Sequence, residues 1–175
     1  YFQVKACLLG LPKLKNYDLY APLPGGRKGI PFDEARGLLL QSFQEFHPLF
    51  GQIAGEFFEK RWVDGPPRKG KYGGAFCSGM TPSLHPYILL NYTGNLRDVL
   101  TLAHEMGHGI HFYLARKQNL MNFDPPLTLA ETASVFGELV MTQALLREER
   151  DLTVRLALLC IEIEDMIATV FRQNV

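Results

Sequence analysis

A pentapeptide, His104-Glu105-Met106-Gly107-His108, places two histidines four residues apart inside an apolar stretch. In a helix, residues four apart lie one turn apart on the same face, so both imidazoles can reach one metal ion. Glu105 follows the first histidine and can reach a water bound to that metal, from which it can take a proton. The pattern therefore requires a helix over these residues, together with a third ligand and a cleft.

The flanking residues predict that this helix is buried. Asn95 follows a glycine and can cap a helix from about Leu96, with Asp98 near the positive end of the helix. Apolar residues then occupy most sides of the segment, which is typical of a helix in the protein interior. These residues are Val99, Leu100, Leu102, Ala103, Met106, Ile110 and Leu114. We expect His104 and His108 to project from this helix.

The His-Glu-x-x-His arrangement is typical of zinc peptidases, whose catalytic metal has three protein ligands and one open position. The next predicted helix, residues 127–147, offers Glu131 and Glu138. Glu131 is far enough beyond His108 for the chain to turn back and lay this second helix beside the first. We expect Glu131 to be the third ligand, because a carboxylate in so apolar a helix is costly unless it meets a cation. Glu138, the competing candidate, is more readily explained as a structural carboxylate or one that supports the ligands.

The other histidines add no ligand. In metzincins the motif continues with a glycine and a third histidine, and His111 and Leu114 occupy those positions here, so that class is excluded. We interpret His111 as a core histidine or one hydrogen-bonded to a carboxylate. His47 and His85 each precede a proline, and we expect both at the surface.

Charge and cysteine content exclude other classes of protein. Eighteen basic residues balance eighteen acidic ones, and no basic cluster is interleaved with aromatics, so neither charge nor pattern favours a nucleic acid as partner. No apolar run reaches the roughly 18 residues of a membrane span. Cys7, Cys77 and Cys160 form neither a disulfide framework nor a CxxC metal site. We expect three buried or inert thiols and a cytoplasmic protein.

The remaining segments predict a mainly α-helical chain. Residues 1–31 are rich in proline and glycine and favour an extended segment or loop. Asp33 favours the N-cap of a helix that ends at Pro48, and a second helix follows to about Trp62. A last helix is expected over residues 151–172.

One small β element interrupts the helices. Residues 63–74 favour a turn-rich loop. The glycines there do not form a phosphate-binding loop, because the Gly-x-x-x-x-Gly-Lys-Ser/Thr motif is absent. Residues 75–77 and 87–91 favour two short strands, which we expect to form the edge of a small sheet. The glycine-rich approach to the first strand favours either a flexible loop or a backbone edge that binds an extended peptide.

Six stretches of the chain together match one known pattern. They are Tyr17–Leu23, Gly70–Cys77, Pro86–Tyr92, Asp98–His111, Ala130–Glu138 and Phe171–Gln173. On these residues the chain resembles the oligoendopeptidase F family, relatives of thimet oligopeptidase. The resemblance covers nearly the whole chain, and the two-histidine helix and the Glu131 stretch are its specific parts.

By that resemblance, His104, His108 and Glu131 would be the zinc ligands and Glu105 the catalytic base. The implied fold is the mainly helical catalytic core of a zincin of the gluzincin type, with a small sheet over the active helix. Residues 73–77 would line the substrate cleft. Residues 1–175 would form a single, partial catalytic domain, a fragment of a longer peptidase. Family members also carry a later segment with substrate-binding His and Tyr residues and a helical N-terminal part, which this sequence lacks.

The predicted function is the zinc-dependent hydrolysis of internal peptide bonds in short peptides, with one Zn²⁺ per chain and Glu105 as general base. Because parts of the family's active site are absent, we expect the isolated chain to be weakly active or inactive. Two other interpretations stay open: a zinc-stabilised binding module without catalysis, and a helical interaction domain whose His-Glu-x-x-His is accidental. Metal content and dependence on Glu105 distinguish the three.

Overall fold

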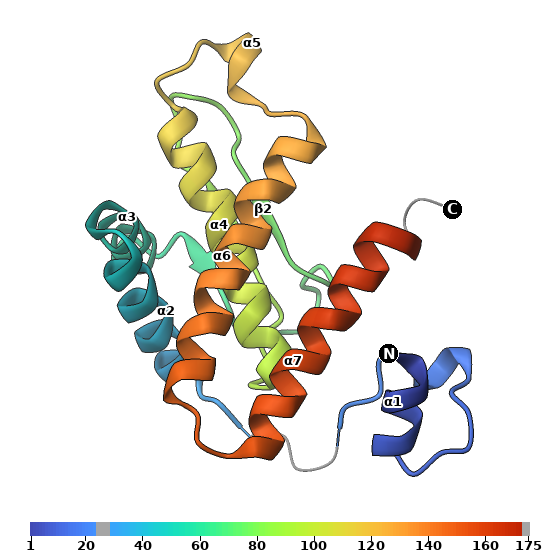
Figure 1. The fold of residues 1–175 in the computed structure, drawn as a ribbon. Helices are drawn as coiled ribbons and strands as arrows, with labels where there is room; N and C mark the ends of the chain where they lie inside the picture. The colour runs from blue at the N-terminus through green and yellow to red at the C-terminus, as the bar shows by residue number, and fades with distance from the viewer. Residues whose placement is uncertain (24–28, 173–175) are drawn as a thin grey trace. The chain divides into compact units, whose positions relative to one another are not determined.

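A computed structural model describes residues 1–23 and 29–172 (Figure 1). The chain divides into two compact units, which are described separately. The larger unit is Lys28–Leu145, and the smaller one combines Tyr1–Arg27 with Leu146–Val175. Helices dominate both units and the strands are few and short, so the predicted mainly α class with a small β element is confirmed.

The larger unit contains a helical pair, a sheet and two long helices. Its helices are α2 (Phe32–Phe46), α3 (Pro48–Glu59), α4 (Leu96–Ala115), the short α5 (Leu120–Phe123) and α6 (Leu127–Glu148), whose last residues belong to the smaller unit. Helix α4 confirms the prediction for the pentapeptide helix. Asn95 caps it, and the side chains of Asn95 and Asp98 form a reciprocal capping box.

Helices α2 and α3 differ from the prediction at their ends. The predicted N-cap at Asp33 is wrong, because the extended backbone of Pro31 precedes the helix and Asp33 lies within its first turn. The predicted break before Pro48 is confirmed, and the Nδ1 atom of the preceding His47 accepts the backbone N–H of Leu49, 3.2 Å away. Helix α3 ends at Glu59 rather than near Trp62.

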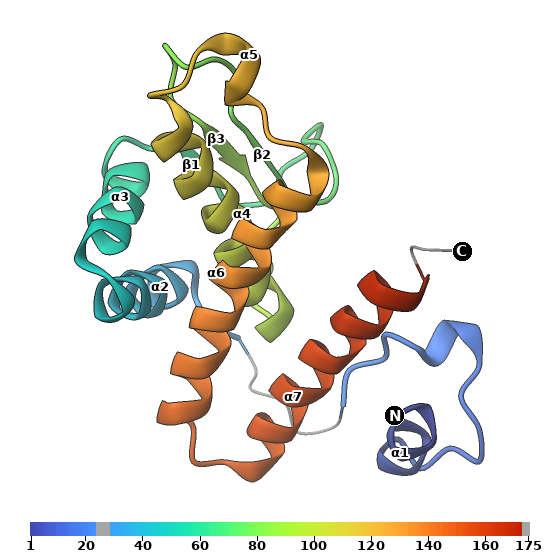
Figure 2. The ribbon, with the colours of Figure 1, turned by 45° about the horizontal axis from the view of Figure 1, so that its top comes forward.

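A three-stranded sheet of β1 (Val63–Asp64), β2 (Phe76–Ser78) and β3 (Tyr87–Leu89) lies over one side of α4 (Figure 2). The strand order is β1-β3-β2, with β1 parallel and β2 antiparallel to β3. Strands β2 and β3 are confirmed, whereas β1 falls in the predicted loop. Two residues carry too short a pattern to predict a strand, and β1 forms only because β3 lies beside it.

Helix α4 is the centre of this unit. Val99, Leu102, Ala103 and Met106 are fully buried, as the all-round apolar pattern predicts. Gly109 lets the helix approach its neighbours, since a Cβ there would come within 2.9 Å of Phe57 in α3 and 3.2 Å of Ile88 in β3. The helix that carries the histidines is therefore fixed between a second helix and the sheet.

Helices α4 and α6 cross at two glycines. A Cβ at Gly107 of α4 would lie 2.4 Å from the carbonyl oxygen of Ala133, and one at Gly137 of α6 would lie 2.5 Å from the carbonyl oxygen of Ala103. Both distances are far below van der Waals contact, so each backbone occupies space that a side chain would need. The crossing brings the acidic residues of α6 close to α4.

The smaller unit contains α1 (Phe2–Leu8), a 3₁₀ helix η1 (Asn16–Asp18), α7 (Leu152–Ile167) and a π-helical turn η2 (Ala168–Arg172). The loop predicted for residues 1–31 is thus wrong over α1. A buried ion pair between Lys5 and Glu164 joins α1 to α7, and the Tyr1 hydroxyl donates to the same carboxylate at 2.6 Å. These tertiary contacts stabilise a helix that its own sequence does not signal.

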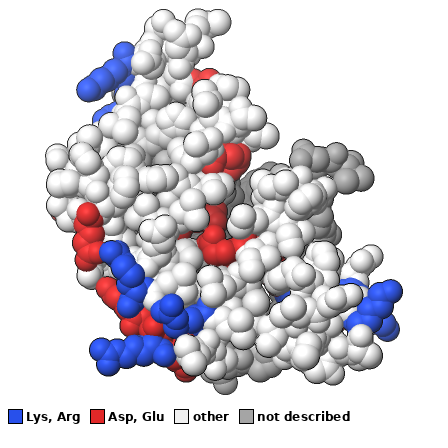
Figure 3. Space-filling model, in the orientation of Figure 1, with Lys and Arg blue, Asp and Glu red and all other residues white. Residues whose placement is uncertain are grey.

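The cysteines differ in burial, and the surface charges are mixed. Burial is confirmed for Cys160, whereas Cys77 is half-buried and Cys7 is exposed. On the face drawn in Figure 3, neither sign of charge dominates. None of the helices in the described part of the chain combines the length and apolar character that crossing a bilayer requires.

Candidate metal centre and active site

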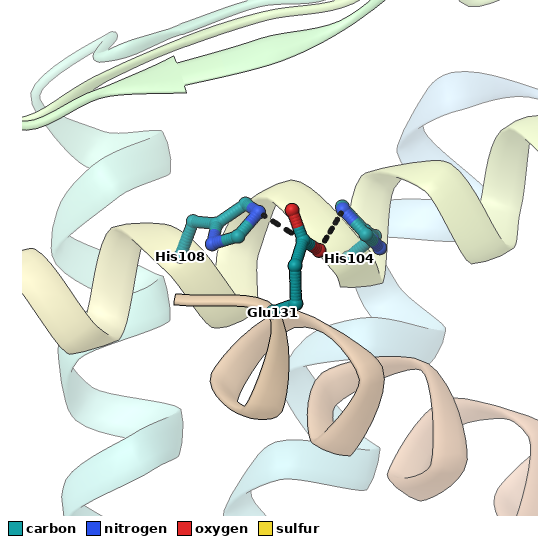
Figure 4. Close-up of side chains that lie close together, drawn as sticks. All are labelled: His104, His108 and Glu131. Carbon is teal, nitrogen blue, oxygen red and sulfur yellow. Dashed lines mark ion pairs between the residues drawn. The ribbon is translucent and has the colours of Figure 1, made fainter. Parts of the chain in front are cut away.

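Helices α4 and α6 bring His104, His108 and Glu131 together, each offering one ligand atom within 4.8 Å of the others (Figure 4). The Oε2 atom of Glu131 lies 3.6 Å from Nε2 of His104 and 3.8 Å from Nε2 of His108. Ligand atoms about 2.1 Å from a tetrahedral zinc stand roughly 3.4 Å apart. The distances from Glu131 to the two histidines are therefore within a few tenths of an ångström of the spacing that one zinc ion requires, and all three ligand atoms lie within 4.8 Å of one another.

The ring nitrogen of His104 that does not face Glu131 has a hydrogen-bond partner. Its Nδ1 atom forms a hydrogen bond with Oε1 of Glu138, which lies about two helical turns after Glu131 on α6. A carboxylate can only accept, so Nδ1 carries the proton and Nε2 presents its lone pair toward Glu131. This is how metal-binding histidines are commonly held. Glu138 therefore contacts the candidate ligand His104 on the side away from Glu131, as a supporting carboxylate would.

The two histidines differ in their affinity for protons. Burial lowers the pKa of His104, but the hydrogen bond to Glu138 and the charges of Glu138, Glu105 and Glu131 outweigh this and raise it above the ordinary value. For His108, burial and the nearby charge of His104 lower the pKa. A neutral imidazole is the ligand form, so His108 is ready to bind a cation at neutral pH.

Glu105 lies between α4 and the edge strand β2. It is only 6% exposed, and its Oε2 atom has no hydrogen-bond partner among the described residues. Burial raises its pKa to about 7. The charges of Glu131 and Glu138 add to this rise, whereas the charge of His104 and a hydrogen bond with the backbone of Cys77 in β2 oppose it. A carboxylate with this pKa can both take and return a proton near neutral pH.

The donor set suits a catalytic zinc site. Two imidazole nitrogens and one carboxylate oxygen are the ligands of several zinc peptidases, and such a set leaves a fourth position open. The buried, unpartnered oxygen of Glu105 is costly unless a further polar group meets it, such as a water or a substrate. The residues present therefore fit zinc with a reacting group beside Glu105.

The strand expected to line the substrate cleft is adjacent to this site. Strand β2 pairs with β3 through Cys77 and Ile88 at its centre, and no strand of the described residues pairs with its other side. The segment before it is held in place, because the Asn91 side-chain amide donates to the carbonyls of Tyr72 (2.7 Å) and Gly74 (2.8 Å). An anchored edge strand beside Glu105 is compatible with peptide binding by strand addition.

The remaining histidines are not part of the group of three candidate ligands, although the charge of His111, one turn after His108 on α4, helps to lower the pKa of His108. His111 is half-buried, not in the core, and lines a cavity of about 390 Å³ with Phe43, Phe50 and Phe136. His47 is exposed, as predicted. His85 is half-buried rather than fully at the surface, because it stacks on Trp62 with ring centroids 4.0 Å apart.

Sequence reasoning missed one polar residue of the site. Ser134 is completely buried, and its hydroxyl donates to Oε2 of Glu131 at 2.8 Å. A serine three residues after a glutamate is common on helices and carries no signal by itself. Its role becomes visible only when α6 is seen against α4.

Comparisons with known proteins agree with this geometry. Residues 28–175 match the sequence profile of peptidase family M3. The chain is 34% identical to oligopeptidase PepF of Bacillus subtilis over 99% of its length, covering 26% of that protein. It is 35% identical to an oligoendopeptidase F homologue of Lactococcus lactis, again over 99% of the chain and 29% of the relative.

A solved structure shows the same fold. The crystal structure of a Chlamydophila abortus protein described as a candidate peptidase superposes with a TM-score of 0.81 at 35% identity, covering 99% of this chain and 29% of that one. The chain thus spans less than a third of the length of these relatives. The predicted resemblance to the oligoendopeptidase F family is confirmed. With most of its residues matched by one family profile, the chain belongs to peptidase family M3.

Proposed function

We propose that this chain is the zinc-binding, base-carrying part of a metallopeptidase that hydrolyses internal peptide bonds of short peptides. The observation that carries the proposal is the convergence of His104, His108 and Glu131 within 4.8 Å, with the buried carboxylate of Glu105 beside them. The names of the relatives, oligopeptidase and oligoendopeptidase F, support peptides as the substrates.

Each protein group has a distinct part in this reaction. Zinc, when bound, would act as a Lewis acid that polarises the scissile carbonyl and makes water a better nucleophile near neutral pH. Glu105 takes the proton of the attacking water and returns it to the leaving amine, for which a pKa of about 7 is well suited. Glu138 keeps His104 in its ligating tautomer through the Nδ1 hydrogen bond.

The test combines metal content with peptide cleavage. We expect about one zinc per chain by elemental analysis of the purified protein. Cleavage of quenched fluorescent peptides should be weak for this chain and strong for a protein of the relatives' full length. Glu105→Gln in the longer protein should keep the zinc and lose turnover, because the amide cannot accept the proton.

Other outcomes would support other functions. Full activity in Glu105→Gln would refute the role of this residue as base. One zinc per chain without any cleavage by the longer protein would favour a non-catalytic zinc module. Absence of zinc from a folded chain would favour a helical interaction domain.

A further inference from the structure

The buried hydroxyl of Ser134 lies directly beneath the carboxylate of Glu131. Ser134 is 0% exposed, and its Oγ is 2.8 Å from Oε2 of Glu131. That same oxygen faces the Nε2 atoms of both His104 (3.6 Å) and His108 (3.8 Å). The serine thus contacts the one atom of Glu131 that would meet a metal ion.

Glu131 needs such support more than the two histidines do. Its side chain is 41% exposed, against 26% for His104 and 13% for His108. A glutamate also has more freely rotating bonds than a histidine, and this freedom is lost when it binds a metal. A hydrogen bond from a buried, immobile donor holds the carboxylate in place before any metal arrives.

Packing explains why the residue is small but not why it is a serine. The Cα of Ser134 would lie 2.9 Å from a Cβ at Gly107, so the α4–α6 crossing is tightest here. Alanine would satisfy that steric limit equally well. The hydroxyl has two acceptors, both on Glu131: the backbone carbonyl oxygen at 3.0 Å and Oε2 of the carboxylate at 2.8 Å, the shorter of the two contacts.

We propose that Ser134 is a positioning residue that fixes Glu131 in its ligating rotamer and thereby raises the affinity of the site for zinc. The proposal rests on the proposed function in taking Glu131 as a metal ligand. It adds a residue that touches neither metal nor substrate and acts only through that ligand.

Zinc affinity of the 175-residue chain, measured by competition with a chelator, is the readout. Ser134→Ala should weaken zinc binding about 10- to 100-fold, as is common when the partner of a metal ligand is removed. Ser42→Ala is the matched control, because Ser42 is also buried and donates to Leu38 O at 2.6 Å, within helix α2. Ser42→Ala should leave zinc affinity unchanged. A cooperative thermal unfolding transition of each metal-free protein checks that all variants fold.

A double-mutant cycle separates positioning from a general structural effect. In a Glu131→Ala background, Ser134→Ala should cause no further loss of zinc affinity, because the ligand through which it acts is gone. Equal losses in both backgrounds would overturn the proposal. Unchanged zinc affinity in Ser134→Ala, together with weak zinc binding by Glu131→Ala, would also overturn the proposal but would leave the proposed function intact. Unchanged affinity in Glu131→Ala would overturn both, because Glu131 would then not be a ligand.

Discussion

Replacing Gly107 by alanine tests whether the close crossing of α4 and α6 sets the metal site. The new Cβ would lie 2.4 Å from the carbonyl oxygen of Ala133, whereas ordinary contact begins near 3.4 Å. The helices must therefore separate by about 1 Å. Glu131 lies two residues before Ala133 on α6, so it would move away from His104 and His108 with the backbone.

The expected energies follow from two opposing effects. Alanine in place of a helical glycine stabilises by roughly 0.5–1 kcal/mol. Overpacking a tight contact costs about 1–3 kcal/mol. Gly107→Ala should thus lose up to about 2.5 kcal/mol of unfolding free energy, and at that upper limit Tm should fall by about 5–10 °C in a chain of this size. Ligand distances tolerate only about 0.2 Å, so zinc affinity should fall at least about 10-fold.

Gly37→Ala is the matched control, because Gly37 lies within α2 and nothing is within 4 Å of its added Cβ. Thermal unfolding should show a rise in Tm of about 1–4 °C for Gly37→Ala and a fall, or no gain, for Gly107→Ala. Chelator competition should give unchanged zinc affinity for the control. If Gly107→Ala gained as much stability as Gly37→Ala and bound zinc like the parent, the crossing would not control the site.

Three further predictions concern other parts of the chain. Glu131→Ala should reduce zinc affinity far more than Glu138→Ala, by chelator competition, and the reverse order would make Glu138 the ligand. Burial raises the pKa of Tyr92 from 10 to about 12, so its contribution to stability is complete below pH 10 and is lost as the pH rises through 12. Tyr92→Phe should reduce the fall of the unfolding free energy over this pH range, measured by denaturant titration at each pH. An unchanged fall would contradict the assignment. Lys5→Met alone removes the cation that faces the buried carboxylate of Glu164 and should cost about 3–5 kcal/mol, whereas Lys5→Met with Glu164→Leu should cost much less. Equal losses would show that charge is not the cause.

The helix of the metal site could be predicted because its signals are local. An apolar stretch, the cap at Asn95 and the spacing of His104 and His108 all lie within a few turns of one another, and α4 begins where the cap predicts. The sequence argument for Glu131 assumes that a carboxylate in an apolar helix is buried and costly without a cation, but its side chain is 41% exposed. Its position beside the histidines follows from the crossing of α4 and α6.

The parts that could not be predicted depend on contacts between distant segments. Strand β1 has two residues and exists through its pairing with β3. Helix α1 lies in a proline- and glycine-rich segment and is held by the ion pair of Lys5 with Glu164. The hydroxyl of Ser134 acquires meaning only where Gly107 allows the two helices to meet. Periodicity and composition do not carry this kind of information.

The ion pair of Lys5 with Glu164 also has a consequence for the order of folding during synthesis. Its partners are 159 residues apart, whereas the larger unit is one uninterrupted stretch, Lys28–Leu145. During synthesis that stretch, with both histidines and Glu131, leaves the ribosome before α7 does. The larger unit, which carries the candidate metal site, can therefore begin to fold before α1 can pair with α7, and the long-range closure of the smaller unit follows it.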